Sequence, residues 1–218
     1  MDNEYVLELE DVGKVYLHPS GENVALDDVS LKIPKNSFIM IYGPSGSGKS
    51  TLLKIAALIK QPSSGSVMLN KNQIDNISTK ERSQLIRNNI GFILQRSNLL
   101  NYLNSLENVL LPMKNSSKEK AKDLMDYVGI ENHTECPKKL SPLDQQKVAL
   151  ARALINKPLI ILADEPTGDL NKTDSEEFIK LLQSFKNETS ILMCTDNPEL
   201  VKYADNGIKI RNGKIIRH

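Results

Sequence analysis

The sequence is poor in features that mark several classes of protein. It has no tryptophan, only two cysteines and almost no net charge, with 28 Lys and Arg against 27 Asp and Glu. A protein that binds nucleic acid through phosphate attraction is usually strongly basic, so the balance argues against nucleic acid as a partner. Cys136 and Cys194 have no second cysteine or histidine at metal-ligand spacing. This indicates two free thiols in a reducing cytoplasm.

Long apolar runs are also missing. The longest, such as Leu159–Ala163, have about five residues, whereas a membrane span needs about 20. The first residues are acidic and lack the basic-then-apolar pattern of a signal peptide. We therefore expect a cytoplasmic chain that does not cross a bilayer. Its 218 residues are enough to bury a core without disulfides, as one compact domain or a core plus a small subdomain.

Hydrophobic periodicity and turn signals predict an α/β protein. Strands are expected at Tyr5–Leu9, Val24–Ile33, Ser37–Tyr42, Ser66–Leu69, Gly91–Leu94, Leu159–Ala163 and Ile191–Cys194, and in a hairpin of Gly207–Arg211 and Lys214–Arg217. Helices are expected at Thr51–Ile59, from Ser78 towards Arg87, at Ser105–Leu111, Ser117–Val128 and Val148–Ile155, after a cap at Thr173–Glu176, and from Pro198. Residues 78–139 read as a mostly helical insertion in an α/β frame.

The most specific motif is Gly-Pro-Ser-Gly-Ser-Gly-Lys-Ser at positions 43–50, which fits G-x-x-x-x-G-K-[ST]. It lies between an apolar strand and a helical stretch, as a phosphate-binding loop requires. Glycines let backbone N–H groups surround phosphate oxygens, and the helix N-terminus adds partial positive charge. Lys49 is placed for the β- and γ-phosphates and Ser50 for Mg²⁺. The predicted nucleotide contacts in this loop are Gly43, Pro44, Ser45, Gly46, Ser47, Gly48, Lys49, Ser50 and Thr51.

Two carboxylates end a later apolar strand, in the run Ile-Ile-Leu-Ala-Asp164-Glu165. Ligands bind at the carboxyl ends of parallel strands. Paired carboxylates at a buried position need a cation or a shared proton, and a magnesium nucleotide supplies the cation. We expect Asp164 to orient Mg²⁺ and Glu165 to polarise the attacking water.

Together these residues resemble the ATP-binding cassette (ABC) ATPases over essentially the whole chain. Gly91–Gln95 looks like the Q-loop, Leu140-Ser141 with Gln146–Ala153 looks like the signature region, and Leu162–Gly168 closely matches the extended Walker B segment. That segment and Leu106–Val109 are most similar to the ATPases of lipoprotein release, macrolide export and cell division. Those ATPases pair with permeases that have large extracytoplasmic domains.

The resemblance implies a P-loop NTPase fold: an ABC ATPase core with an N-terminal antiparallel β subdomain and a helical subdomain. The whole chain would form one domain, with residues 1–77 and 157–218 as the core and about 78–156 as the helical subdomain. ATP and Mg²⁺ would be the cofactors, and Tyr16 would stack on adenine. Gln95 would touch Mg²⁺ and sense the membrane partner, while Ser141 would contact the ATP of a second ATPase subunit.

Three regions depart from the family pattern. The signature, Leu-Ser-Gly-Gly-Gln or Glu in the family, reads Leu-Ser-Pro142-Leu143-Asp144 here. Asp196 occupies the switch-histidine position and would repel a γ-phosphate at neutral pH. The family's Gly-Asn-Leu-Asp appears as Gly-Asp-Leu-Asn171, with acid and amide exchanged. The changes leave the nucleotide-loading residues intact but predict slow hydrolysis.

We interpret the chain as the ATPase subunit of an ABC-type system, peripheral on the inner face of the membrane, driving a separate transmembrane permease of export or extraction type. An ATP-binding regulatory or structural partner with little turnover is the main alternative. A soluble ABC protein of translation or DNA repair is a third. The single cassette, the missing coiled-coil arm and the near-zero net charge count against that third class.

Overall fold

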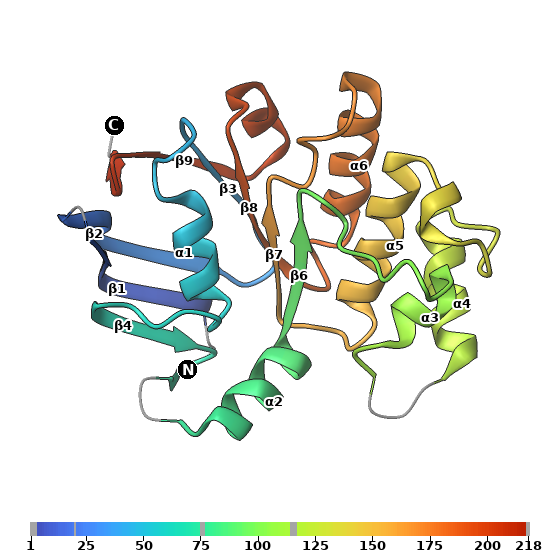
Figure 1. Cartoon of the computed structure of the whole chain (residues 1–218), viewed down its shortest axis with the longest axis horizontal. Coiled ribbons are helices and arrows are strands. Elements are labelled where there is room, and N and C mark those ends of the chain that lie inside the picture. The colour runs from blue at the N-terminus through green and yellow to red at the C-terminus, as the bar shows by residue number, and fades with distance from the viewer. Residues whose placement is uncertain (1–3, 20, 75–76, 114–116, 217–218) are drawn as a thin grey trace.

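The computed structural model describes residues 4–19, 21–74, 77–113 and 117–216. They form two sheets with helices packed beside them (Figure 1). The strands are β1 (Tyr5–His18), β2 (Gly21–Pro34), β3 (Phe38–Tyr42), β4 (Ser64–Leu69), β5 (Asn72–Gln73), β6 (Ile90–Leu94), β7 (Ile160–Asp164), β8 (Ser190–Thr195), β9 (Asn206–Arg211) and β10 (Lys214–Ile216). The α-helices are α1 (Lys49–Ala56), α2 (Thr79–Asn89), α3 (Ser105–Leu110), α4 (Lys118–Tyr127), α5 (Pro142–Leu154) and α6 (Lys172–Ser184), with short 3₁₀ helices at Pro137–Lys139 and Pro198–Tyr203.

The smaller sheet is antiparallel, in the order β2-β1-β4-β5. Its first strand continues to His18, well beyond the predicted Tyr5–Leu9. The pairing of β1 with β2 shifts register between Leu9 and Lys14, and Asp11 has a φ of 49°. These bulges break the period-2 alternation on which the sequence prediction depended.

The larger sheet has the order β10-β9-β3-β8-β7-β6, and all its neighbours are parallel except the β9–β10 hairpin. Alternate residues of β3 enter different cores. Ile39 and Ile41 pack with α1 and the smaller sheet, whereas Phe38 and Met40 pack with α5 and α6. Because both faces are covered, these strands are apolar throughout. The α/β class with an antiparallel subdomain is therefore confirmed.

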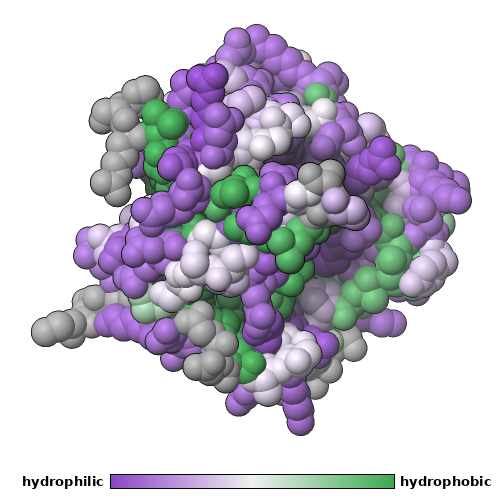
Figure 2. Space-filling model, turned by 60° about the vertical axis from the view of Figure 1, so that its left-hand side comes forward, coloured by the Kyte–Doolittle hydropathy of each residue, from purple (hydrophilic) through white to green (hydrophobic). Residues whose placement is uncertain are grey.

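The segment from 78 to 156 contains both helices and one strand of the larger sheet, since β6 pairs with β7. The proposed boundaries at 77 and 156 stay a prediction. Arg217, the last residue of the predicted hairpin, lies outside the described residues. Among the helices of those residues, none combines the length and the apolar character that a membrane span requires. In Figure 2 most of the visible surface is hydrophilic, and the hydrophobic residues lie in separate strips.

Local capping explains where several helices begin. Ser78 and Glu81 form the predicted reciprocal capping box of α2. The cap of α6, however, was placed wrongly at Thr173–Glu176. Asn171 is the N-cap, and its side chain accepts a hydrogen bond from the Asp174 backbone N–H.

Loss of this cap should be measurable. Replacing Asn171 with Ala leaves the Asp174 N–H without its side-chain partner, so we expect the free energy of unfolding to fall by about 1 kcal/mol. Equilibrium urea unfolding followed by circular dichroism tests this. Asn212→Ala, at the β9–β10 turn, removes no helix cap, so the size of its effect does not bear on the assignment of Asn171 as the cap. An unchanged urea midpoint in Asn171→Ala would contradict that assignment.

Candidate nucleotide site

The glycine-rich loop connects the end of β3 to the start of α1. Gly46 and Gly48 have φ of 77° and 107°, and Gly48 is the N-cap of α1. A Cβ on Gly48 would lie 2.5 Å from the carbonyl oxygen of Ala25. Glycine is therefore required at position 48 both for its backbone conformation and for close packing against β2. The buried Ser47 hydroxyl has no hydrogen-bond partner, and an anion in the loop would supply one.

Lys49 lies inside this loop and is almost fully buried, with 4% of the residue exposed. Its Nζ donates to the carbonyl oxygens of Gly43 at 2.8 Å and Pro44 at 3.1 Å. It also forms an ion pair with Glu165 Oε1 at 3.3 Å. The lysine is thus held beneath the loop by two carbonyls and one carboxylate. A phosphate entering the loop would compete with Glu165 for the ammonium group.

The acidic end of β7 lies against the same helix. Ser50 Oγ donates to Asp164 Oδ1 at 3.1 Å, and the Glu165 backbone N–H donates to the Cys194 carbonyl oxygen at 2.9 Å. Glu165 has a φ of 48°, in the left-handed region that non-glycine residues seldom adopt. This conformation turns the chain out of the sheet directly after Asp164, at the strand edge where Lys49 lies.

Gln95 follows β6 and reaches the same edge, because Leu94 of β6 is paired with Asp164 of β7. A cavity of about 510 Å³ opens there. The side chains that line it come from the loop, from α1 and from the ends of β6 and β7: Ser45, Ser50, Leu94, Gln95, Arg96, Asn98, Asp164 and Glu165. The structure therefore brings together the phosphate loop and three of the predicted catalytic and metal-binding residues.

The oxygen atoms at this cavity suit Mg²⁺. Ser50, Asp164 and Gln95 offer a hydroxyl, a carboxylate and an amide oxygen, the hard ligands that this cation prefers. Among the described residues no group of three or more His, Cys, Asp or Glu could hold a metal ion. A site with few protein ligands fits Mg²⁺ that is bound together with substrate phosphates.

Cys194 closes the back of the site. It is fully buried, its Sγ lies 3.8 Å from the Lys49 carbonyl oxygen, and burial together with the nearby Asp164 carboxylate raises the pKa of its thiol. The residue therefore remains a neutral thiol and packs as an apolar side chain.

Three predicted residues lie apart from this cavity. Tyr16 on β1 has the ammonium groups of Lys60 and Lys14 at 4.9 and 5.6 Å from its ring centroid. Asp196 is exposed after β8 and lines a neighbouring recess of about 340 Å³, which it shares with Glu165. Ser141 is the N-cap of α5 and lines neither space. The ATP that Ser141 is predicted to contact is the one bound by a second subunit.

The changed signature forms a well-capped helix start. Ser141 is the N-cap of α5, accepting from the Asp144 backbone N–H at 3.1 Å and donating to Asp144 Oδ2 at 2.8 Å. Pro142 occupies the first helical position, where its missing N–H costs nothing. Leu143 is buried in the core with α3 and α6. These substitutions preserve the fold of α5 and place a carboxylate beside the Ser141 hydroxyl.

Two residues near Gln95 were not assigned a role from the sequence. Gln146 of α5 is buried, and its Nε2 donates to the carbonyl oxygens of Leu94, at 2.9 Å, and Gln95. Asp169 accepts a hydrogen bond from Gln95 Nε2 at 2.9 Å. A glutamine on the otherwise apolar face of α5 was the signal for Gln146. For Asp169 the signal was its exchange with the amide at position 171.

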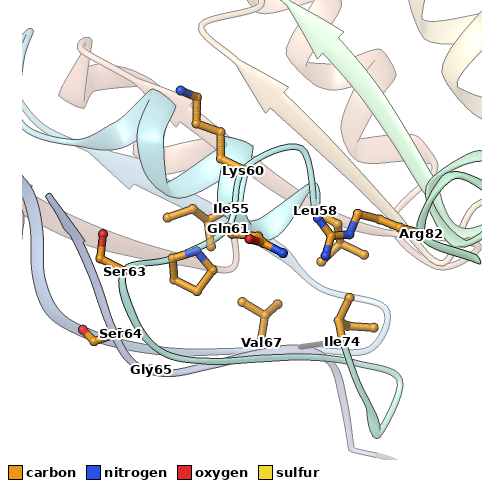
Figure 3. A pocket seen from close by; sticks show the side chains of 11 residues that line it. Ile55, Leu58, Lys60, Gln61, Ser63, Ser64, Gly65, Val67, Ile74 and Arg82 are labelled. Carbon is orange, nitrogen blue, oxygen red and sulfur yellow. The ribbon is translucent and has the colours of Figure 1, made fainter. Parts of the chain in front are cut away.

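A separate recess of about 250 Å³ lies between the end of α1, β4 and α2 (Figure 3). Arg82 reaches from α2 towards Leu58 at its side, over an apolar floor that includes Val67 and Ile74. None of the predicted nucleotide-binding residues lines it.

Comparisons with known proteins agree with this geometry. The ABC transporter family matches residues 26–168. An uncharacterised ABC transporter ATP-binding protein of Methanocaldococcus jannaschii is 40% identical, covering 97% of this chain and 98% of its own length. The lipoprotein-releasing system ATP-binding protein LolD of Bordetella pertussis is 35% identical, covering 98% and 96%.

Solved structures also match this chain. The dimeric ABC transporter cassette MJ0796 superposes with a TM-score of 0.89 and 32% identity, with 97% of each chain covered. A second dimeric structure of that cassette, in a post-hydrolysis state with ADP and Pi, gives a TM-score of 0.88. The sequence resemblance is thereby confirmed: the chain belongs to the ABC transporter family, as an ATP-binding subunit of the ATPase type.

Proposed function

We propose that this chain binds and hydrolyses MgATP to drive a separate membrane permease of export or extraction type. The observation that carries the proposal is the single cavity onto which the phosphate loop, the acidic end of β7 and Gln95 converge. A second copy or a related ATPase subunit would complete the assembly, since the similar cassette MJ0796 is dimeric. The chain would then lie in the cytoplasm, peripheral on the inner face of the membrane.

The side chains divide the chemistry among them. Lys49 binds the β- and γ-phosphates. When its ammonium group leaves Glu165 to pair with phosphate, the Glu165 carboxylate becomes free to accept a proton from the attacking water. Ser50, Asp164 and Gln95 would hold Mg²⁺, which when bound neutralises developing charge on the phosphates. Tyr16 provides the ring on which adenine stacks, with Lys60 over that ring.

A groove of about 460 Å³ supports the proposal of a permease partner. It is lined by α2, the start of β6, the end of α3 and α5, including Ile86, Arg87, Phe92 and Leu111. The lining has two arginines and no carboxylate, which favours a cytoplasmic segment of the permease that is apolar and acidic. Since β6 continues directly to Gln95, a segment seated here would act on the nucleotide site through that strand.

Crosslinking tests this partner. A photoreactive amino acid at Ile86, in the groove, should crosslink in membranes of the source cell to an integral membrane protein that resists carbonate extraction. The matched position is Tyr127, which is 61% exposed on α4 outside the groove. Equal capture from both positions, or capture of soluble proteins alone from Ile86, would contradict the proposed docking.

The departures at the signature and the switch position favour slow turnover, as the regulatory alternative also requires. In a homodimer each site would combine Pro142, Leu143 and Asp144 from one subunit with Asp196 from the other. Electrostatic donors to a reacting group are typically worth ~10²–10³ each in rate. The Ser141–Asp144 hydrogen bond occupies one such donor.

Repair of one departure alone should therefore have little effect. We expect Asp196→His, or Pro142→Gly with Leu143→Gly, to raise steady-state MgATP hydrolysis by less than about tenfold. The three changes together should raise it by at least ~10², more than the product of the separate gains. Thermal unfolding of each variant controls for lost stability at the start of α5. Gains that simply multiply would contradict the view that the two regions act as a unit.

A further inference from the structure

Gln95 is held from two sides, by Gln146 of α5 and by Asp169 of the loop after β7. The side chain of Gln146 fixes its backbone from α5, and Asp169 binds its amide nitrogen from the loop after β7. Gly168 lies directly against the same side chain, since a Cβ there would come within 2.9 Å of Gln95 Cδ and Nε2. Gly168 and Asp169 thus contact the Gln95 amide closely and hold it in place.

The chemistry of Asp169 determines which end of that amide faces the cavity. An ionised carboxylate only accepts hydrogen bonds, so it binds the NH₂ end of a glutamine amide and not the oxygen. An asparagine, which both donates and accepts, would bind either end. With Nε2 committed to Asp169, Gln95 Oε1 is the atom left for the cavity that it shares with Ser50 and Asp164.

The second half of the acid–amide exchange fits the same account. At position 171 the amide Nδ2 donates to Asp174 Oδ2 at 2.8 Å while Oδ1 caps α6. An aspartate at 171 would bring two carboxylates together at this cap and lose that donor. Asp169 and Asn171 are therefore each matched to a local partner.

We propose that Asp169 is a positioning residue for the metal: its carboxylate fixes the Gln95 amide so that Oε1 faces the divalent cation of the bound nucleotide. The inference rests on the proposed MgATP function. Groups that orient a metal ligand from behind typically contribute 10–100-fold to metal affinity. Asp169 is exposed and caps no helix, so its replacement by Asn should leave the fold intact.

Manganese binding tests the proposal. Mn²⁺ affinity is measured by electron paramagnetic resonance on the full chain saturated with the ATP analogue AMP-PNP, and AMP-PNP affinity is measured separately in EDTA. We expect Asp169→Asn to weaken Mn²⁺ binding about tenfold and to leave metal-free nucleotide binding unchanged. Asp123→Asn, which removes an exposed carboxylate on α4, is the matched control and should change neither quantity.

The Gln95→Ala background separates positioning from simple charge attraction. If Asp169 acts through Gln95, Asp169→Asn in that background should change Mn²⁺ affinity less than twofold, because the ligand that it orients is gone. An equal loss in both backgrounds, or no loss in the unaltered chain, would overturn the proposal. Failure of the proposed function would look different: the unaltered chain would bind no AMP-PNP under either condition, which overturns both.

Discussion

Glu165→Gln is expected to lower the steady-state rate of phosphate release from MgATP by about 10²–10⁴-fold. The amide keeps the shape of the side chain but cannot accept the proton of the attacking water. The Glu165 carboxylate also pairs with Lys49 at 3.3 Å in the unbound chain, so it competes with the phosphates for the Lys49 ammonium group. Its removal ends that competition. Nucleotide affinity should therefore be equal to or higher than that of the unaltered chain. Glu188→Gln, an exposed carboxylate after α6, is the matched control.

The same variant should accumulate as an ATP-bound dimer, since the similar cassette MJ0796 forms a dimer and slowed chemistry leaves the closed state populated. Size-exclusion chromatography with MgATP measures this. A monomer at all ATP concentrations, for the free chain and for the permease-bound form alike, would contradict a closed ATP-bound dimer. A monomer in the free chain together with a dimer on the permease would indicate that Pro142 and Leu143, at the start of α5, prevent the free chain from closing.

Lys49→Ala is expected to weaken ATP binding by about 10–100-fold, the usual range for loss of a charged hydrogen-bond donor. Two effects oppose each other. The ammonium group no longer meets the phosphates, but nucleotide also no longer has to break the Lys49–Glu165 ion pair, which offsets part of the loss. Equilibrium binding of a fluorescent ATP analogue measures the loss. Unchanged affinity would show that the site is assigned wrongly.

A double variant resolves the two effects of Lys49. In the unaltered chain Lys49 must leave Glu165 before it meets the phosphates, whereas in the Glu165→Gln background it need not. Lys49→Ala should therefore weaken binding more in that background than it does alone. Lys54→Ala, on α1 but outside the phosphate loop, is the control for removing a cation from the same helix. Losses that are equal in both backgrounds would contradict the Lys49–Glu165 competition.

The sequence was most informative where one motif fixes both local structure and chemistry. The phosphate loop needs a strand before it, a helix after it and glycines with positive φ, and residues 38–56 supply all three. The acidic end of β7 was equally readable, because a five-residue apolar run followed by two carboxylates marks a strand end in a parallel sheet.

Features that depend on distant contacts were not readable in this way. Gln95 and Asp169 are 74 positions apart and meet only because β6 and β7 are neighbours. The lysine over the Tyr16 ring comes from the turn after α1, which ends at Ala56 rather than at the predicted Ile59 because Leu58 adopts a φ of 60°. The α6 cap was misplaced by two residues, since both Asn171 and Thr173 can cap a helix.

We expect this cavity to hydrolyse MgATP slowly, through Glu165, because the signature and switch positions depart from the family. The most direct test is the steady-state rate of phosphate release by the purified chain, with Glu165→Gln as the blank. We predict a rate above that blank and below the ~1 s⁻¹ that marks the low end of ordinary enzyme turnover. A rate equal to the blank would contradict hydrolysis at this site, and a rate of ~1–10 s⁻¹ would contradict the role given to Pro142, Leu143, Asp144 and Asp196.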